Sequence, residues 1–237
     1  MTDWPCSICP VRDAGFCAAV LGMHRQETRL RTRPDWQSFR EVHPNEIVLV
    51  RQEPSEYVHV LCEGWAFHYL HLTDGRRQIL RFLLAGDLFA AISFFVERLP
   101  FSVRALTQIR LSRFKREAVK EMLNTNPALS QVLSATCVDE DTDAGELLLA
   151  LGQRSADERI AYLFLHLIKR IKSRGVIRAQ RYPFPLRQQD IAGITGVTPV
   201  HVSRVLGNLH RRGICRLSGG ILEVADPAEL ERIGSVK

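Results

Sequence analysis

The stretch from Leu186 to Leu209 constrains this chain most, because its local signals specify two short helices with a sharp turn between them. Gly196 supplies the turn, since glycine adopts left-handed dihedrals without steric cost. Thr198 followed by Pro199 predicts the start of the second helix, with a hydroxyl N-cap and proline at the first helical position. Residues at helical spacing are expected to face a core: Ile191, Ala192, Ile194, Val202, Val205, Leu206 and Leu209. Together these signals predict a helix-turn-helix.

The opposite face of the second predicted helix is small and polar, with one arginine near its N-terminal end. A recognition helix contacts base edges from that end, and arginine can donate two hydrogen bonds to guanine. We therefore expect Arg204 to read a guanine, while His201 reaches either a phosphate or a base edge. The other residues expected on this face are Thr198, Val200, Ser203, Gly207 and Asn208. The alternative is a helical hairpin within a core, in which Arg204 is merely solvated.

Two short apolar runs follow, at residues 214–217 and 221–224, and the sequence Ser218-Gly219-Gly220 separates them. This pattern predicts a β-hairpin, and the whole segment then reads as a winged helix-turn-helix. Such a wing usually touches phosphates. The residues expected to hold phosphate are Arg211, Arg212 and Arg216.

Charge and composition agree with this interpretation. Residues 154–216 hold thirteen Lys and Arg against three Asp and Glu, whereas the whole chain of 237 residues has a net charge of +6. Concentrated basic charge is expected where a protein binds phosphates, although a merely solvated surface is the alternative. The chain is long enough for two domains, and 46% hydrophobic with 24% charged residues is typical of a soluble globular protein.

Several classes of protein are disfavoured. No apolar run reaches membrane-spanning length, and the N-terminus lacks the apolar core of a signal peptide. We therefore expect a cytoplasmic protein with no membrane partner. The sequence shows no nucleophile–base pairing, no phosphate-cradling loop after a strand and no His-rich metal site, so no enzyme is expected.

Residues 42–115 consist of short alternating or apolar runs separated by turn signals. The runs fall at 46–51, 57–61, 65–72, 78–84 and 102–114. Several short strands with glycine turns predict a small antiparallel barrel or roll.

A short helix over residues 116–122 and a long one from Pro127 to about Leu151 are expected next, and Ser155-Ala-Asp-Glu158 predicts the start of another. The apolar stripe of the long helix comprises Leu129, Val132, Leu133, Thr136 and Cys137, continued by Leu147, Leu148, Leu149 and Leu151. One roll cannot cover this much apolar surface, which predicts a coiled-coil contact between two copies. The alternative is that the helix packs only on its own barrel.

The order of roll, long helix and winged helix-turn-helix resembles the Crp/Fnr family of bacterial transcription regulators over about residues 35 to 225. Pieces that match the family are Gly64, Asp74-Gly75, Leu84-Ala-Gly86-Asp87-Leu88, Ala156-Asp-Glu-Arg159 and Val202-Ser203-Arg204. The resemblance implies a homodimer that binds double-stranded DNA at an inverted repeat, and that activates or represses by contacting or blocking RNA polymerase.

The resemblance also implies an α+β architecture with a fixed order of parts. Residues 1–30 are then a cysteine-containing N-terminal segment, and 31–124 a cyclic-nucleotide-binding-like β-roll that acts as sensor domain. Residues 125–152 form the dimerisation helix. Residues 153–237 form the winged helix-turn-helix DNA-binding domain.

Two departures from the family pattern bear on specificity and ligand. The family usually has a glutamate where this chain has Val200, and valine offers only apolar contact, for example to a thymine methyl. We therefore expect a half-site altered at one base pair. Cyclic-nucleotide-binding members use a Gly-Glu pair and an Arg-Ser pair for the phosphate, but here the first is absent and the second falls on Leu99-Pro100. An unneutralised phosphate would lose its solvation uncompensated, which argues against cyclic AMP or GMP.

Three of the six cysteines, Cys6, Cys9 and Cys17, lie in the first seventeen residues. Clustered cysteines in a cytosolic protein favour metal or redox chemistry over a structural disulfide. Their spacing resembles the Fnr-type branch, in which three N-terminal cysteines and one barrel cysteine hold a [4Fe-4S] cluster that oxygen destroys. The resemblance thus implies a cluster at these three residues.

The fourth cluster ligand is missing from its expected place, because the barrel position falls at about Ser112. The alternatives are Cys62, Cys137 or an acidic side chain such as Asp141 or Asp143. For each of these two cysteines, plain burial is favoured over a role as a ligand. Without a cluster, the regulator would respond to thiol oxidation, a small ligand or its own expression level. A more distant hypothesis is a small-molecule binding module whose winged domain serves protein contacts.

Overall fold

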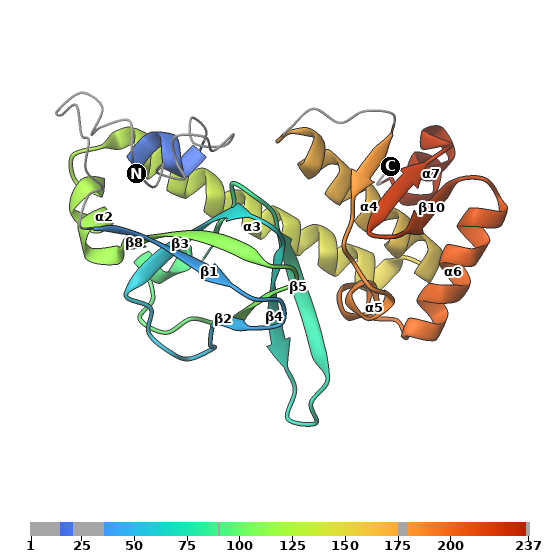
Figure 1. The fold of residues 1–237 in the computed structure, drawn as a ribbon, viewed down its shortest axis with the longest axis horizontal. Coiled ribbons are helices and arrows are strands. Elements are labelled where there is room, and N and C mark those ends of the chain that lie inside the picture. The colour runs from blue at the N-terminus through green and yellow to red at the C-terminus, as the bar shows by residue number, and fades with distance from the viewer. Residues whose placement is uncertain (1–14, 21–35, 90, 175–179, 236–237) are drawn as a thin grey trace. The chain divides into compact units, whose positions relative to one another are not determined.

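The computed structural model describes residues 15–20, 36–89, 91–174 and 180–235. The chain divides into two compact units (Figure 1). The first contains residues 1–70 and 82–142, and the second contains residues 71–81 and 143–237. None of the described helices is long and apolar enough to cross a membrane.

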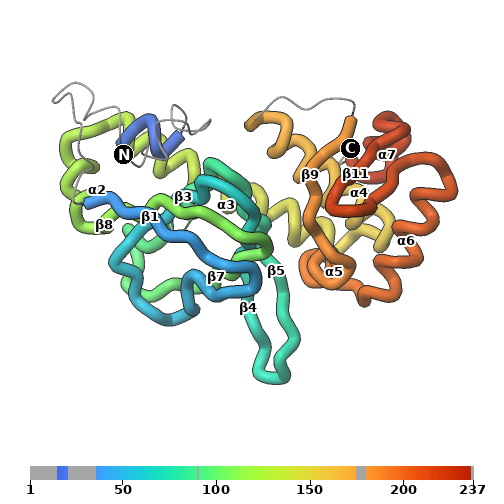
Figure 2. The backbone as a smooth tube through the Cα atoms, viewed as in Figure 1, coloured from blue at the N-terminus to red at the C-terminus, as the bar shows by residue number. Residues whose placement is uncertain are grey.

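Two four-stranded sheets make up the β-rich part of the chain. Figure 2 traces the path of the backbone through this part. One sheet has the order β1-β8-β3-β6 and the other the order β2-β7-β4-β5. The strands are β1 (Gln37–Val42), β2 (Ile47–Leu49), β3 (Tyr57–Glu63), β4 (Ala66–His71), β5 (Arg77–Leu83), β6 (Leu88–Phe89), β7 (Ser102–Ala105) and β8 (Ile109–Lys115). The ladders that join β1, β8, β3 and β6 are all antiparallel. A 3-10 helix, η2 (Ala91–Phe94), follows β6.

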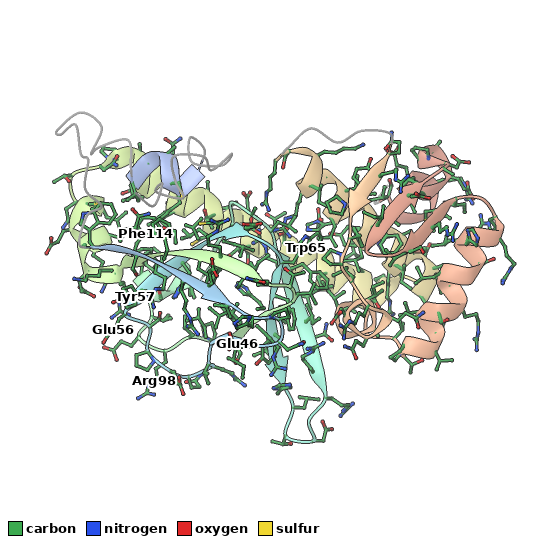
Figure 3. The ribbon with its side chains drawn as sticks, viewed as in Figure 1. Glu46, Glu56, Tyr57, Trp65, Arg98 and Phe114 are labelled. Atoms are coloured by element: carbon green, nitrogen blue, oxygen red, sulfur yellow. The ribbon has the colours of Figure 1, made fainter. Side chains whose placement is uncertain are left out.

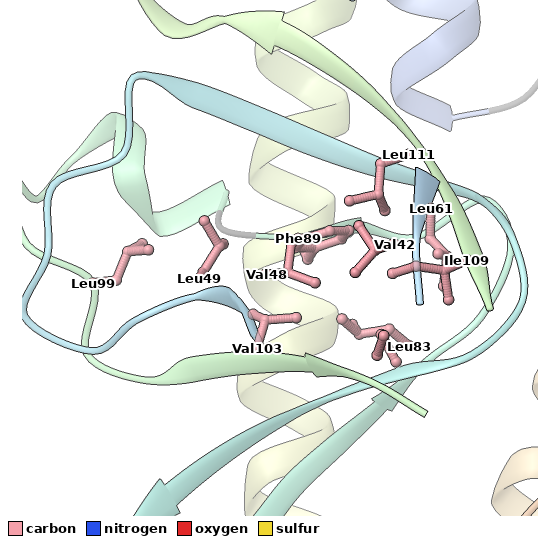
Figure 4. Packing of buried hydrophobic residues seen from close by; sticks show 12 residues of the cluster. Val42, Val48, Leu49, Leu61, Leu83, Phe89, Leu99, Val103, Ile109 and Leu111 are labelled. Atoms are coloured by element: carbon pink, nitrogen blue, oxygen red, sulfur yellow. The ribbon is translucent and has the colours of Figure 1, made fainter. Parts of the chain in front are cut away.

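One face of the β1-β8-β3-β6 sheet forms an apolar core with the second sheet. Side chains alternate across a strand, so Val42, Leu61 and Leu111 share a face. They pack with residues of the other strands and of the loop before β7 (Figure 4): Val48, Leu49, Ala66, Leu83, Phe89, Leu99, Val103, Ala105 and Ile109. The predicted roll is therefore confirmed.

The opposite face of the same sheet is covered by helical segments. Phe114 packs on this face, edge-to-face with Phe16 at 5.3 Å between ring centroids and stacked on Trp36 at 5.8 Å (Figure 3 labels Phe114). The helical segment at residues 15–20 contributes Cys17 and Val20 to this cluster. The helices α2 (Arg116–Leu123) and α3 (Pro127–Gln153) contribute Val119, Leu129 and Leu133.

The long helix α3 leaves its other side uncovered. Residues that repeat in a heptad pattern along it are all exposed: Ala128, Gln131, Ala135, Val138, Thr142, Gly145, Leu149 and Gly152. Val138 is 64% exposed, Leu149 is 43% exposed and their neighbour Leu148 is 71% exposed. We call the heptad residues together with Leu148 the α3 seam. Leu129 and Leu133 of the predicted stripe are buried, whereas Leu148 and Leu149, which continue it, are exposed. The first part of the stripe therefore lies on the buried side of the helix, and only these later leucines coincide with the seam.

The second unit is built mainly from helices and a small sheet. It contains α4 (Ala156–Lys172), α5 (Gln188–Thr195), α6 (Pro199–Arg211) and α7 (Pro227–Gly234). Its sheet has the order β10-β11-β9, with β9 (Arg181–Pro183), β10 (Cys215–Ser218) and β11 (Ile221–Val224). Ser155 caps α4 in a reciprocal capping box with Glu158, as predicted.

The helix predictions are confirmed to within a few residues, whereas several small elements were missed. The run predicted at 102–114 is two strands, β7 and β8, with a turn between them. Strands β1, β6 and β9 and helix α7 have no counterpart among the predicted elements. The missed strands are two to six residues long, too short for a clear periodic signal.

Candidate nucleic-acid interface

Helices α5 and α6 form the predicted helix-turn-helix. Gly196 ends α5 with a φ of +68°, the left-handed conformation that glycine adopts most readily. The Thr198 hydroxyl accepts a hydrogen bond from the His201 backbone N–H at 3.2 Å, and Pro199 occupies the first helical position. Val202, Val205 and Leu209 are buried, so the face of α6 that packs on the unit is the predicted one.

The other face of α6 is open along its N-terminal half. Val200 is 72% exposed, and Ser203 and Arg204 are exposed as well. His201 is partly buried and Thr198 is exposed at the start of the helix. The structure thus brings together on one exposed surface the residues predicted to read bases.

Arg159 of α4 holds the end of α5, directly before the turn to α6, by hydrogen bonds. Its Nε–H donates to the Arg154 carbonyl at 2.8 Å, and its Nη1–H donates to the Thr195 carbonyl at 3.2 Å. Thr195 is the last residue of α5, where carbonyls lack partners within the helix. One guanidinium therefore ties the end of α5 to the start of α4. The sequence motif contained Arg159, but its role follows only from this geometry.

The start of α5 is fixed by a buried carboxylate. Asp190 Oδ2 accepts a hydrogen bond from the Arg187 backbone N–H at 3.0 Å, and Oδ1 lies 3.4 Å from Arg77 Nη2. Both residues belong to the second unit. Burying a charge is costly unless it is paired and hydrogen-bonded, and Asp190 has both kinds of partner.

Three exposed residues at the start of α5 were not predicted to take part: Arg187, Gln188 and Gln189. In a helix-turn-helix the first helix crosses the DNA backbone, and the N–H groups at a helix start attract phosphate. The signal was present in the sequence as a polar run directly before Asp190. That run has no apolar periodicity, which is the pattern on which the helix prediction depended.

The wing forms as predicted, with β10 and β11 paired in an antiparallel register and β9 as a third strand. Arg211 and Arg216 are exposed and make no ion pair within the described residues, whereas Arg212 pairs with Glu229 at 2.5 Å. Arg212 is therefore already partly neutralised. Cys215 is buried in the wing, and burial raises the pKa of its thiol to about 11, consistent with a packing role.

The predicted cysteine site is only partly within the described residues. Cys6 and Cys9 lie outside them, and Cys17 is buried in the apolar cluster around Phe114. Ser112, at the position of the family's barrel cysteine, is buried, and its hydroxyl accepts a hydrogen bond from Gln37 at 2.7 Å.

The cysteines expected as a fourth ligand, Cys62 and Cys137, do not form a metal site within the described residues. The Cys62 thiol donates to the Val60 carbonyl at 3.8 Å. Burial, and then the charge of Glu140, raise the pKa of the Cys137 thiol and so oppose the thiolate that a metal requires. Across the described ranges, no three His, Cys, Asp or Glu side chains form a group that could hold a metal ion. Taken alone, these ranges do not fit a cluster site.

The position that would neutralise a cyclic phosphate lies in the core of the roll. Leu99 is 1% exposed and packs among the apolar residues shown in Figure 4. A leucine there cannot neutralise a phosphate.

Comparisons with known proteins agree with this architecture. Residues 39–126 match the family described as cyclic nucleotide-binding domain, and residues 158–233 match the Crp-like helix-turn-helix domain. The nitrogen fixation regulation protein FixK of Azorhizobium caulinodans is 33% identical over 182 residues, which cover 76% of this chain and 73% of that protein. The transcriptional activator protein FnrL of Cereibacter sphaeroides is 27% identical, over 90% of this chain and 85% of that protein.

A solved structure shows the same fold. The structure of FixK2 from Bradyrhizobium japonicum superposes with a TM-score of 0.77 at 26% identity, and the alignment covers 85% of this chain and 98% of that one. The fold and its Crp-like helix-turn-helix domain define a DNA-binding transcription regulator. The chain belongs to the Crp/Fnr family, whose members are regulators and not enzymes.

The Arg159 bridge gives a testable consequence for the interface. Arg159→Met keeps the apolar stem but removes both hydrogen bonds, so we expect a loss of about 1–3 kcal/mol in the free energy of unfolding. DNA affinity should fall with it, because the end of α5 is no longer held. Urea denaturation and a DNA-binding titration measure the two effects. Lys169→Met, an exposed residue on the same helix, is the control, and equal losses in both variants would contradict the assigned role.

Proposed function

We propose that this chain regulates transcription as a cytoplasmic homodimer that binds an inverted-repeat DNA site through two copies of α6. The observation that carries the proposal is the open face of α6, where Arg204, Ser203 and Val200 are exposed together on a helix whose turn is held rigidly. Direct readout needs side chains that can enter the major groove without first breaking other contacts.

Arg204 is proposed to read a guanine. It makes no ion pair within the described part of the chain and lies near the N-terminal end of α6. Val200 stands one helical turn before it with an apolar side chain. A valine offers no acceptor to a cytosine amino group but packs well against a thymine methyl. His201 and Thr198 flank these residues. Arg211, Arg212 and Arg216 are proposed to contact phosphate, although Arg212 also forms an ion pair with Glu229.

Replacing Arg204 tests base reading directly. Arg204→Ala should weaken binding to the cognate site by about 1–3 kcal/mol and relax the preference at one base pair of each half-site. A selection of binding sites from random duplexes, followed by titration, measures both. Arg51→Ala removes an exposed arginine from the barrel and is the matched control. If the Arg204→Ala protein discriminates among sites as the unmodified chain does, α6 is not the reading helix.

Salt dependence separates this proposal from a winged domain that binds protein. A dimer that neutralises several phosphates loses affinity steeply as salt rises, because counterions are released on binding. A salt-independent interaction with duplex DNA would favour the small-molecule binding module instead.

The α3 seam is proposed as the dimer contact. Its members repeat at alternating spacings of three and four residues, the pattern by which two helices pack in a coiled coil. Three residues of the seam have large exposed apolar side chains, namely Val138, Leu148 and Leu149. Small residues of the seam, such as Ala135 and Gly145, allow close approach of a second helix.

A charge placed on the seam should separate the dimer. Val138→Glu with Leu149→Glu puts four carboxylates into one interface, so we expect monomers by light scattering and a loss of at least tenfold in affinity for the inverted repeat. Ala144→Glu is the control, because Ala144 is exposed on the same helix but is not one of the heptad residues. A double variant that remains dimeric would place the contact elsewhere.

The signal is proposed to act through Cys6, Cys9 and Cys17. The support is twofold: the spacing of the three cysteines, and the burial of Cys17 in the same apolar cluster as Leu129 and Leu133 of α3. A change in the chemical state of Cys17 would disturb the packing of the helix that carries the seam. The [4Fe-4S] cluster is the form that the family resemblance implies, and thiol oxidation is the alternative.

Anaerobic purification distinguishes these forms. About four irons per chain, with visible absorption that bleaches in air, would establish the cluster. Iron-free protein whose DNA affinity falls on oxidation, but not in a Cys17→Ala variant, would establish a thiol switch. The control is Cys215→Ala, which removes a buried cysteine from the wing. Iron-free protein whose DNA affinity does not change on oxidation would contradict the proposal. Regulation by a small ligand or by expression level would then remain.

A further inference from the structure

The β1-β8-β3-β6 sheet carries a polar row at one end of its core-facing surface. Ser38 pairs with Arg113, Arg113 pairs with His59, and His59 pairs with Phe89. Paired residues in antiparallel strands project from the same face of a sheet, so these four side chains lie in one line across four strands. We call them, together with Arg40 and Tyr57, the barrel-end row.

Arg40 and Tyr57 share this face. Arg40 lies two residues from Ser38 on β1, and Tyr57 lies two residues from His59 on β3, so the alternation of side chains puts them on the same side. Farther along the strands, the face is the apolar core that contains Val42 and Leu61. The sheet therefore changes from apolar to cationic within a few residues, on its inner side.

Arg113 is held in place within the row but its charge is not neutralised. Its Nε–H donates to the Ser38 hydroxyl at 3.1 Å, and its guanidinium carbon lies 4.9 Å from the Tyr57 ring centroid. Neither Arg113 nor Arg40 forms an ion pair with any carboxylate in the described ranges. Arg110, on the same strand as Arg113, does pair with Glu63, but on the opposite face of the sheet.

His59 is the buried member of the row. It is 4% exposed and stacks on Phe89 with 5.2 Å between ring centroids. Its Nδ1 is buried with no hydrogen-bond partner in the described part of the molecule. Burial, then the charges of Arg113 and Arg40, lower the pKa of the imidazole to about 3, so it is neutral at physiological pH. A neutral imidazole can still donate one hydrogen bond from a ring nitrogen.

This arrangement is unfavourable for stability as it stands. A buried nitrogen without a partner loses its hydration uncompensated, and two nearby cations repel each other. A small anion would correct both, because its oxygens accept from the guanidiniums and from the imidazole at once. Guanidinium groups are also the side chains best matched to carboxylate and phosphate geometry.

We propose that the barrel-end row binds a small oxyanion, either a carboxylate or inorganic phosphate. The site uses none of the cysteines and none of the residues of α6. It is therefore separate from the proposed DNA interface, and the two proposals can fail independently.

Calorimetric titration tests the site with inorganic phosphate and with acetate, at constant ionic strength maintained by chloride. We expect saturable binding of one or both anions at one site per chain, and the two probes distinguish phosphate from carboxylate. Arg113→Gln should weaken that binding about tenfold or more, because it removes a charge-assisted hydrogen bond. Arg110→Gln is the matched control on the same strand and should bind like the unmodified protein.

A second variant guards against misfolding. His59→Phe keeps an aromatic ring to stack on Phe89 but removes both nitrogens, so the fold should persist while anion affinity falls. Absence of saturable binding of either anion overturns the proposal. So does unchanged affinity in a folded Arg113→Gln protein, since the anion would then occupy another basic surface such as that of α6. If Arg113→Gln does not fold, unchanged affinity in the His59→Phe protein overturns the proposal in the same way.

Discussion

The geometry of the reading helix depends on how the end of α5 is held. A helix leaves its last carbonyls without partners, and here Arg159 supplies a donor to the last of them from the neighbouring helix α4. Gly196 then reverses the chain in a left-handed conformation, and Thr198 caps the next helix. These three residues, together with the buried face of α6, hold its exposed residues in a fixed direction. Specific recognition needs that rigidity, since an interface that is ordered on binding loses affinity to the ordering.

Electrostatic pairing separates the arginines that serve structure from those left for a partner. Arg110 and Arg159 bind a carboxylate or carbonyls of this chain. Arg212 pairs with Glu229 and so belongs partly to this group, although it is also among the proposed phosphate contacts. Arg204, Arg211 and Arg216 have no carboxylate partner among the described residues and are exposed. Arg40 and Arg113 lack a carboxylate partner in those same ranges, on a different surface. Sequence position alone does not predict which arginines are paired. Arg211 and Arg212, for example, are adjacent, but only Arg212 has a carboxylate partner in the described ranges.

The long helix α3 connects the cysteine-containing cluster with the proposed dimer contact. Its buried side packs against the cluster that contains Cys17, and its exposed side carries the heptad repeat of the α3 seam. A change at the cysteines and a change in dimer packing would thus act on opposite sides of the same helix. A switch of this kind requires an element with two alternative packings that the signal can bias.

Much of the architecture could be predicted from sequence, because helix caps, glycine turns and apolar spacing are local signals. The helix-turn-helix, the wing, the long helix and the capping box at Ser155 all follow from residues close together in the chain. The short strands β1, β6 and β9 could not be predicted, because strands of this length are stabilised by their neighbours and not by their own pattern. The cysteine spacing predicted a site whose first two members lie outside the described residues.

The sequence by itself determined which residues stand on the polar face of the N-capped helix α6, Arg204 among them, since capping and helical spacing are local properties. Only the tertiary structure decided how those residues are held. Arg159 and Thr195 are thirty-six residues apart, and their hydrogen bond exists only once α4 and α5 pack together. The barrel-end row is likewise invisible in the sequence, because Ser38, Arg113, His59 and Phe89 become neighbours through strand register alone. Register is set by which side chains the sheet buries, and that is a property of the whole fold.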